Sequence, residues 1–513
     1  MTLSVQVDWA RNGSWTDVGD DVSARVRPIT GAVTASYGRS QSTALTPITA
    51  GQGTVILDNS SRDYSPRNTS SPLYGRLKPA RPARIRRTAG ANTYTLFVAH
   101  TDSTPINPDV AAKRVTLQLV DSLADLRNIT ISTQLYGGIR TGAAIGKVLD
   151  AIGWTGGRDL DLGSSILPWW WEEGTDALQA MQNLIAAEGP PALLTIGDSG
   201  EIIFRDRSHR LVRTRSTTSQ ATLRGSGAEP TVLAGSFDYN EAWQNVINTA
   251  VESVPLRRQQ IPQVVWSSTD VIDLATGQTV TVKATTSDPY TGAITPVFGT
   301  DITVTAGSAT VIASLDRTSG AGVTISLIAP GPSRITSLQL RAQPVTLMRT
   351  LGYTASDPSS VSDYGARAHP DIPFAGYGDT NAIVQGTLAQ RAQPLPIVTC
   401  SFQVGGSRTA DIAKAQTILG LDLSDRVTVI EPETNLSTDF FVESIAHELT
   451  GDDNHVVTLG LEACPTQVTN VLILGSATRG ILGTNRLGKQ GLDDPSTVFV
   501  LGTSLVGTGL LGH

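Results

Sequence analysis

The pair His447-Glu448 is the first candidate for chemistry in this sequence. A histidine followed by a glutamate opens the helical zinc-protease motif, which needs a second histidine four residues after the first. Position 451 is Gly, and the residues around the pair alternate as in a strand. The other histidines considered show no ligand spacing with one another or with the two cysteines; these residues are His100, His209, His369, His455, Cys400 and Cys464. The sequence therefore predicts no metal site.

Paired carboxylates occur at Glu172-Glu173 and at Asp452-Asp453. Adjacent acids point apart in regular structure, whereas a glycosidase needs two carboxyl groups that face each other across the substrate. The sequence also has no Gly-x-Ser-x-Gly elbow, no phosphate loop and no Gly-x-Gly-x-x-Gly after a strand. We therefore predict no catalytic residue, no cofactor and no enzymatic activity.

Three adjacent tryptophans, Trp169, Trp170 and Trp171, form the third candidate. Three successive indoles cannot all face one core in a strand or a helix, so at least one is expected near the surface or at a seam between domains or subunits. A platform on which sugar rings stack is one interpretation. Packing against the next helix and a neighbouring domain is the other, and it is the one we favour.

The composition limits the class of protein. A chain of 513 residues allows about three to five domains, and its 49 glycines, Thr- and Ser-rich segments and few aromatic residues indicate a mainly β protein. No run of about eighteen apolar residues occurs, and the N-terminus lacks a basic segment followed by an apolar one. We therefore expect neither a membrane span nor a signal peptide. Two cysteines are too few for a disulfide framework.

Charge is distributed unevenly along the chain. The net charge of −7 argues against a general nucleic-acid binder. Residues 1–90 carry twelve Lys and Arg against six Asp and Glu, whereas residues 411–465 carry two against eleven. Opposite signs on two regions favour head-to-tail contacts between copies, or docking onto a charged ring. Two ordinary solvated surfaces are the alternative.

Local patterns predict the elements that would carry these residues. Alternating strands indicate a β-barrel over 1–120, crossed by a long ordered segment with four prolines between Asp63 and Pro82. An α+β domain is predicted over 121–230. Its two helices are expected to be capped by Thr141 and Thr175 and to end at Gly153 and Gly189, ahead of a hairpin over 192–204.

A change of composition marks a further module. Residues 255–344 are rich in Thr, Val, Ser and Gly, with alternation such as Thr279-Val280-Thr281-Val282 and turn signals at regular intervals. This pattern is typical of a β-sandwich. We predict an inserted immunoglobulin-like or carbohydrate-binding-like module.

Several motifs resemble one protein family in the same order along the chain. The run LDNSSRDYSPRNTSSPLYGRLKPARPARIR, from Leu57, is similar to a strand, loop and return strand in the first barrel of tail hub (minor tail) proteins of long-tailed actinobacterial phages. The runs TGAAIGKVLDAIGW and IGDSGEIIFRDR resemble the second domain of these proteins. More remotely, the chain is similar to the baseplate hub of contractile-tailed phages and to tail-associated lysins.

This resemblance implies a fold and a set of partners. The fold class is mainly β with a smaller α+β domain, two hub-type β-barrels, the inserted sandwich and an extended C-terminal segment. The second barrel comprises 231–254 and 345–465, split by the sandwich. The family implies a homotrimer whose barrels form a pseudo-sixfold ring at the distal tail tip of the virion, assembled in the host cytoplasm. Its partners would be a distal tail protein or tube ring, a tape-measure protein and a downstream tip or fibre protein, with DNA passing without specific binding.

The C-terminal segment, 466–513, repeats itself. The residues from Val471 to Ser476 match those from Val498 to Thr503, and each copy precedes a further Leu-Gly pair. Such β-prone, nearly uncharged strands cannot bury themselves in so short a segment. We expect them to contact trimer neighbours or a partner protein, with four candidate contact residues: Leu474, Leu482, Leu501 and Leu511. A competing hypothesis for the whole chain is a receptor-binding tail protein that binds host cell-wall glycan through 255–344.

Overall fold

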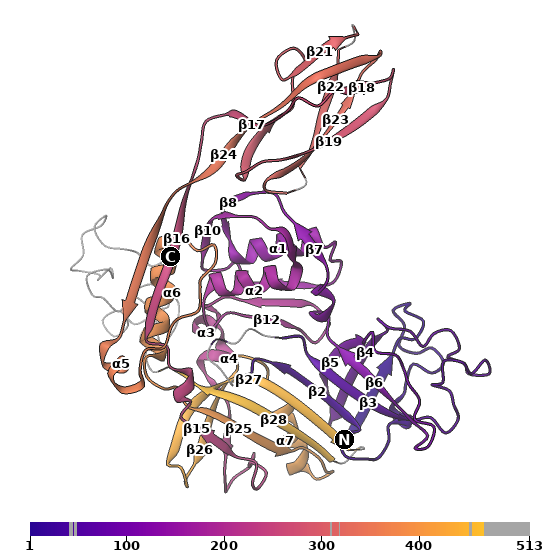
Figure 1. The fold of residues 1–513 in the computed structure, drawn as a ribbon. Coiled ribbons are helices and arrows are strands. Elements are labelled where there is room, and N and C mark those ends of the chain that lie inside the picture. The colour runs from indigo at the N-terminus through magenta and orange to yellow at the C-terminus, as the bar shows by residue number, and fades with distance from the viewer. Residues whose placement is uncertain (41–44, 46–48, 308–309, 318, 451–453, 466–513) are drawn as a thin grey trace.

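Strands dominate the architecture, with a few helices between them (Figure 1). The computed structural model of the chain describes residues 1–40, 45, 49–307, 310–317, 319–450 and 454–465. The strands form several sheets with separate hydrophobic cores, and two of the longer helices lie in one α+β part. The prediction of a mainly β, multidomain protein with a smaller α+β part is confirmed.

The largest sheet has twelve strands drawn from both ends of the described chain. Six come from the N-terminal part: β1 (Thr2–Val7), β2 (Val33–Gly38), β3 (Gln52–Asp58), β4 (Pro82–Ala89), β5 (Asn92–Thr101) and β6 (Arg114–Val120). Six come from later in the chain: β14 (Ser219–Arg224), β15 (Asp238–Asn240), β25 (Ile397–Gln403), β26 (Arg426–Glu431), β27 (Leu436–Thr450) and β28 (Asn454–Ala463). We call these the N-terminal half and the C-terminal half of the sheet.

The two halves meet where β2 pairs antiparallel with β27, from Val33 opposite Leu449 to Gly38 opposite Ser444. The order from one end is β1-β4-β5-β6-β3-β2-β27-β28-β25-β15, with β26 beside β27 and β14 beside β26. The sequence predicted two hub-type β-barrels, and in the structure the strands of both regions belong to one hydrogen-bonded sheet. Strand β14, assigned above to the α+β domain, pairs with β26 in this sheet.

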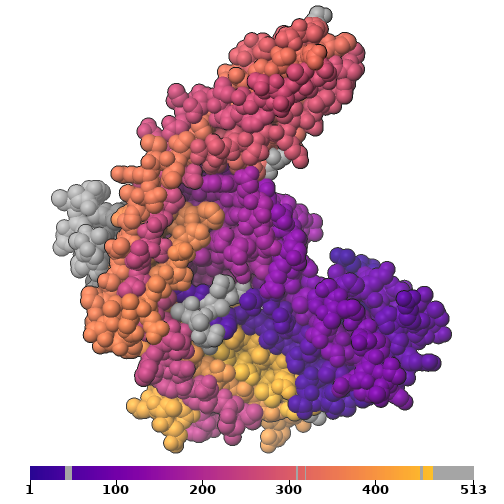
Figure 2. All heavy atoms as spheres, in the orientation of Figure 1, coloured from indigo at the N-terminus to yellow at the C-terminus, as the bar shows by residue number. Residues whose placement is uncertain are grey.

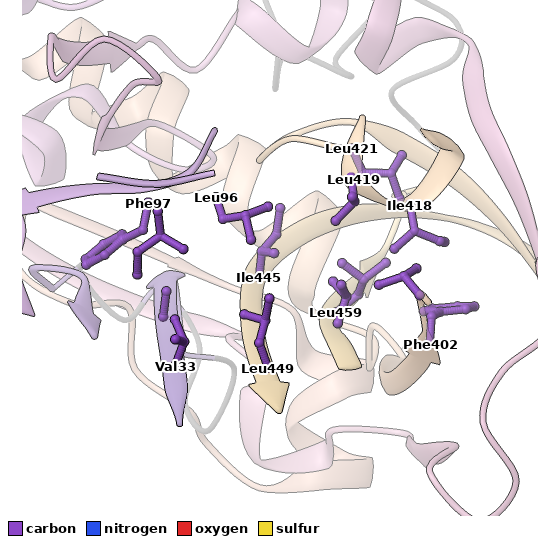
Figure 3. Close-up of a cluster of buried hydrophobic side chains, with 14 of the residues drawn as sticks. Val33, Leu96, Phe97, Phe402, Ile418, Leu419, Leu421, Ile445, Leu449 and Leu459 are labelled. Carbon is purple, nitrogen blue, oxygen red and sulfur yellow. The ribbon is translucent and has the colours of Figure 1, made fainter. Parts of the chain in front are cut away.

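One hydrophobic core runs beneath both halves. Figure 3 shows Val33 of β2 and Phe97 of β5 close to Ile445 and Leu449 of β27. Helix α7 (Thr409–Leu419) adds Ile418 to the same cluster and contacts β4 and β5. Because apolar side chains from both halves are excluded from water together, the halves stabilise each other.

The α+β part has its own core. Its elements are β7 (Thr130–Ser132), β8 (Tyr136–Arg140), α1 (Thr141–Ala151), β9 (Arg158–Leu160), β10 (Ile166–Trp170), β11 (Glu173–Asp176), α2 (Ala177–Glu188), β12 (Leu193–Ile196) and β13 (Ile202–Arg205). Both predicted helices and the β12–β13 hairpin are confirmed.

The two predicted helix caps were wrong. Thr141 is the first residue of α1, and its hydroxyl donates to the buried Glu188 carboxylate at 2.6 Å instead of capping the helix. In α2 the cap is Asp176, whose carboxylate accepts from the backbone N–H of Gln179, one residue after the expected Thr175. An ionised carboxylate accepts more strongly than a hydroxyl, which explains the choice of Asp176.

An arm projects from this body (Figures 1 and 2). Its base is a two-stranded ribbon of β16 (Thr249–Gln259) and the long β24 (Ser333–Ser356), paired from Thr249–Ser356 to Gln259–Val345. Its outer part is a sandwich built from β24 together with β17 (Gln263–Ser268), β18 (Ile272–Leu274), β19 (Thr279–Thr285), β20 (Tyr290–Ile294), β21 (Ile302–Ala306), β22 (Ile312–Arg317) and β23 (Gly322–Ile328). Both ribbon strands therefore run through the boundaries predicted at 255 and 344.

The remaining helices brace the base of the arm and the junction. They are α3 (His209–Val212), α4 (Thr214–Thr217), α5 (Pro358–Tyr364) and α6 (Tyr377–Arg391). Helix α6 packs on the ribbon through Val384 and Leu388, which touch Ala250 and Tyr353 in a small separate core. Within the described ranges no helix is long and apolar enough to cross a membrane.

Candidate functional site: the junction of the sheet halves and the base of the arm

Strand β27 changes its hydrogen-bonding partner part-way along its length. Its first residues pair with β26, and those from Ser444 onward pair with β2. The ladder to β28 shifts register between Val442 and Ser444, so Glu443 is the extra residue of a β-bulge. A bulge bends the strand and redirects a side chain. This bend allows one strand to serve both halves.

The end of β2 fits closely against the bulge. Gly38 has a φ of +108°, and a Cβ added there would lie 2.4 Å from the carbonyl oxygen of Glu443. The next backbone N–H, that of Arg39, donates to this carbonyl at 2.7 Å. Only glycine combines this left-handed backbone with so close an approach. Gly38 therefore fixes the distance between the two halves.

The bulge places the Glu443 carboxylate between two buried guanidinium groups. Its Oε1 lies 2.7 Å from Nη1 of Arg210, and its Oε2 lies 4.0 Å from Nη1 of Arg39. Arg39 also donates to the carbonyl of Ala192 at 2.6 Å, and Arg210 donates to the Ser424 hydroxyl at 3.0 Å. Burial lowers the pKa of Arg39, and Glu443 opposes this effect. This cluster ties β2, β27 and the α+β part together.

A second buried ion pair links the C-terminal half to α6. Arg391, in the last turn of α6, donates to both carboxylate oxygens of Glu462 at 2.9 and 2.8 Å. Burial would raise the pKa of Glu462, but Arg391 holds it below its usual range. Because α6 packs on the ribbon, the pair connects the sheet to the base of the arm. Buried pairs of this geometry are costly to break because the remaining charge is left in a low-dielectric interior.

His447 and His455, rejected above as metal ligands, form a buried pair in the core of the C-terminal half. Nδ1 of His447 lies 3.1 Å from Nε2 of His455, and the ring of Tyr37 on β2 packs beside them. Burial lowers the pKa of His447 to about 4. Burial, His447 and Arg87 lower the pKa of His455 well below its usual value. Both rings are therefore neutral near pH 7.

The three tryptophans lie in different environments. Trp170 is fully buried in the α+β core and stacks on Tyr136 with 5.8 Å between ring centroids. Trp169 is half-buried, and its indole N–H donates to the carbonyl of Arg257 in the ribbon at 3.3 Å. The Arg257 guanidinium lies 5.2 Å from the ring centroid of Trp171. The indoles on either side of Trp170 thus contact the arm.

The seam with the arm continues into the sandwich. Trp171 packs so closely on Gly320 that a Cβ at this glycine would lie 2.6 Å from the indole. Beside it the Ser319 hydroxyl donates to Glu173 at 2.9 Å. Glu172, the other member of the paired carboxylates, is buried and accepts from the indole N–H of Trp170 at 3.2 Å. The pair thus points in opposite directions and connects different parts of the protein.

The remaining candidate residues from the sequence are not among the described residues of the junction or the seam. Asp452, Asp453 and the candidate contact residues Leu474, Leu482, Leu501 and Leu511 lie outside the described residues. Among the residues that the structure does describe, no three His, Cys, Asp or Glu side chains are grouped so that they could hold a metal ion. Cys400 and Cys464 are both free.

The buried charges at the junction were missed by the sequence analysis, although one signal was present. Inward-facing residues of β27 switch parity, from Phe440 and Val442 to Ile445 and Leu449. Strand side chains alternate with a period of two, so such a switch indicates a bulge with one extra residue. The acid at the switch, Glu443, could therefore have been singled out. Its partners could not, since they lie far away in sequence.

Comparisons with known proteins give structural neighbours only. No family model matches the sequence, and no curated protein matches it. A tail protein from Neisseria meningitidis MC58 aligns with 90% of this chain and 96% of its own, at 10% identity and a TM-score of 0.46. The 43 kDa tail protein of prophage MuSo2 from Shewanella oneidensis aligns with 90% of this chain and 98% of its own, at 11% identity and a TM-score of 0.44. The prophage tail protein gp18 from Listeria monocytogenes EGD-e aligns with 90% of this chain and 94% of its own, at 9% identity and a TM-score of 0.40.

Proposed function

We propose that this chain is a structural hub of a bacteriophage tail tip or baseplate. In this role it closes the tail tube as a homotrimer, attaches tip or fibre proteins and opens for passage of the genome. The observation that carries the proposal is the pair of six-stranded halves joined through β27 in each subunit. The ordered series of hub-like motifs in the sequence supports the same role.

The junction suits a protein that must match rings of different symmetry. Because β27 and the shared core join the halves, one subunit offers two β surfaces at a fixed spacing. Three such subunits in a closed ring would display six halves to a hexameric tube. Head-to-tail contacts close into a ring when the rotation between subunits permits it. A rigid junction keeps that rotation constant, which is the role we assign to Gly38 and the Glu443 cluster.

The arm suits attachment at the outside of such a ring. The sandwich projects beyond the body at the end of the ribbon (Figure 2). One face of the ribbon base packs on α6, which anchors this base to the body. The net charge of −7 is consistent with a ring through which DNA passes without binding.

Subunit counting tests the proposal. The purified protein, or the tail tip that contains it, is examined by mass photometry and by class averages in electron microscopy. We expect a ring with three times the subunit mass of 54.0 kDa. A particle whose subunit number is not divisible by three, or purified tails that lack the chain, would contradict the proposal.

The position of the sandwich keeps a second function open, namely binding of host cell-wall glycan. Of its aromatic side chains, Tyr290 is buried and Phe298 is 42% exposed. Full-length protein is tested for saturable binding to host wall polysaccharide beside a variant in which a short glycine turn joins the paired residues Gln259 and Val345. Binding that is lost in this armless variant and in Phe298→Ala would favour the glycan function. Equal binding by all three proteins would exclude it.

A further inference from the structure

Two ends of the branched twelve-stranded sheet, β1 and β15, face away from each other. The order begins at β1 and ends at β15. Figure 1 shows β15 at the lower left of the body and β4 to β6 at the right, and Figure 2 shows the corresponding surfaces on opposite sides. Two surfaces on opposite sides of one subunit can contact each other only head-to-tail between copies.

The β15 end carries an exposed tryptophan with acidic neighbours. Trp243, in the short 3-10 helix Trp243–Asn245 that follows β15, is 65% exposed, although tryptophan is usually among the most buried residues. Ala242 before it has a left-handed φ of +52°, which helps to turn the chain outward. Asp238 and Glu241 are exposed beside it, and the Glu241 carboxylate accepts from the Tyr239 hydroxyl. Neither acid joins an ion pair between described residues. Exposed Leu233 adds apolar surface next to β25.

The β1 end carries two arginines that have no carboxylate partner among the described residues. Nε of Arg84 and Nη2 of Arg86 donate to the same Oε1 of Gln6, at 2.9 and 2.7 Å. The Gln6 amide donates in turn to the carbonyl of Trp15, and Arg84 lies 4.2 Å from the Trp15 ring centroid. One neutral oxygen thus receives two guanidinium groups. Burial and the charge of Arg86 lower the pKa of Arg84.

The aspartates nearest to this surface are engaged within their own loop. Asp8 accepts from the backbone N–H groups of Asn12 and Gly13, and Asp20 accepts from those of Trp9 and Asp17. Asp17 and Asp21 accept from Asn12 and Ser23 respectively. None of these carboxylates forms an ion pair with Arg84 or Arg86, and both arginines are held in place by Gln6, with Arg84 also over the Trp15 ring.

We infer that the β15 end of one copy, with Trp243, Asp238 and Glu241, docks on the Gln6, Arg84 and Arg86 surface of the next copy. The occupant is a second copy of this chain, because the exposed indole and acids at the β15 end complement the arginines at the β1 end. An exposed indole can cover the aliphatic and guanidinium surface beside Trp15, and two carboxylates outside any ion pair between described residues can face two guanidinium groups that lack a carboxylate partner there. The inference rests on the proposed trimeric hub and names its subunit interface.

Complementation between two variants tests a head-to-tail contact directly. Trp243→Ala removes the anchor at one end, and the double variant Arg84→Glu/Arg86→Glu reverses the charge at the other. Each variant alone is expected to be monomeric by sedimentation velocity, with subunit affinity reduced about tenfold or more. Mixed together, they retain one intact face each and should form a one-to-one dimer that does not grow further. Thermal unfolding of each variant checks that it folds.

Controls and outcomes separate this inference from the proposed function. Arg334→Glu on the sandwich and Val212→Ala on α3 alter exposed residues away from both faces and should leave assembly unchanged. A wild-type trimer that persists in both test variants overturns the interface but leaves the hub intact. Loss of assembly in each variant without dimer formation on mixing also overturns it. A wild-type protein that stays monomeric at the highest concentration reached overturns both the interface and the trimeric hub.

Discussion

The junction between the sheet halves and the seam between body and arm are held in opposite ways. At the junction, charged groups are buried: Glu443 is 4% exposed and Arg210 is 5% exposed, and both lie above a continuous apolar core. At the seam, the half-buried Trp169 and Trp171 contact the ribbon and one turn of the sandwich. Buried charges tolerate little displacement, whereas half-exposed rings can slide. We therefore expect a rigid body that carries an adjustable arm.

Removing the central charge of the junction should have the largest effect. Glu443→Ala leaves the guanidinium groups of Arg39 and Arg210 buried without their carboxylate. We expect the free energy of unfolding to fall by about 3–5 kcal/mol, measured by chemical denaturation. Glu448→Ala is the matched control, because Glu448 is an exposed glutamate on the same strand. Equal effects of the two substitutions would contradict a special role for the buried cluster.

A methyl group added at the contact between β2 and β27 should cause the second-largest loss of stability. Gly38→Ala puts a Cβ 2.4 Å from the Glu443 carbonyl and forces a left-handed φ on alanine. Gly13→Ala, the control, meets only the backbone penalty, since no atom lies within 4 Å of its added Cβ. That penalty is about 1 kcal/mol, and the added clash should raise the cost at Gly38 to about 2 kcal/mol or more. Denaturation midpoints of the two variants provide the comparison.

Acid should weaken the body through its histidine pair. Burial lowers the pKa of His447 to about 4, whereas a histidine in the unfolded chain has a pKa near ~6.5. Between these two pH values the unfolded chain therefore binds more protons than the folded protein. The contribution to stability is therefore complete above pH ~6.5 and is lost as the pH falls toward 4, by up to about 1.4 kcal/mol per pH unit for each histidine. The arm, 249–356, contains no histidine.

This effect is measured by denaturation at a series of pH values. His447→Leu should show a shallower loss of stability than the wild type between pH ~6.5 and ~4, because one of the two titrating groups is gone. Burial raises the pKa of Asp121 to about 6, which acts in the opposite direction in both proteins. The difference between the two curves therefore isolates the histidine. If stability fell with pH equally steeply in both proteins, protonation of the histidine pair would not be coupled to folding.

The smallest change in stability is expected at the seam. Trp171→Ala removes the contact with Gly320 and the Arg257 guanidinium while leaving the body core untouched. The unfolding free energy of the body should change by less than about 0.5 kcal/mol, while small-angle scattering shows a wider spread of arm positions. Val264→Ala, at an exposed position of β17, is the control. An unchanged scattering profile for Trp171→Ala would mean that the ribbon alone sets the arm.

Local patterns in the sequence were sufficient for much of the fold. The helices α1 and α2 follow from apolar residues at helical spacing, and Gly153 and Gly189 adopt the left-handed φ values expected after them. Alternation predicted the strands of the body and the sandwich. These signals arise from neighbours within a few residues, so they survive without knowledge of the rest of the chain.

The long-range pairings depended on tertiary structure. The parity switch in β27 marks a bulge at Glu443, but nothing local indicates that its partners are Arg39 and Arg210, or that β2 continues the sheet of β27. Likewise, the tryptophan run predicted a seam or a sugar platform, and only the packed chain shows which indole meets the core and which meets the arm. Periodicity fixes which face of an element is buried. The element that covers that face is selected by the packing of the whole chain, where residues hundreds of positions apart compete for the same surface.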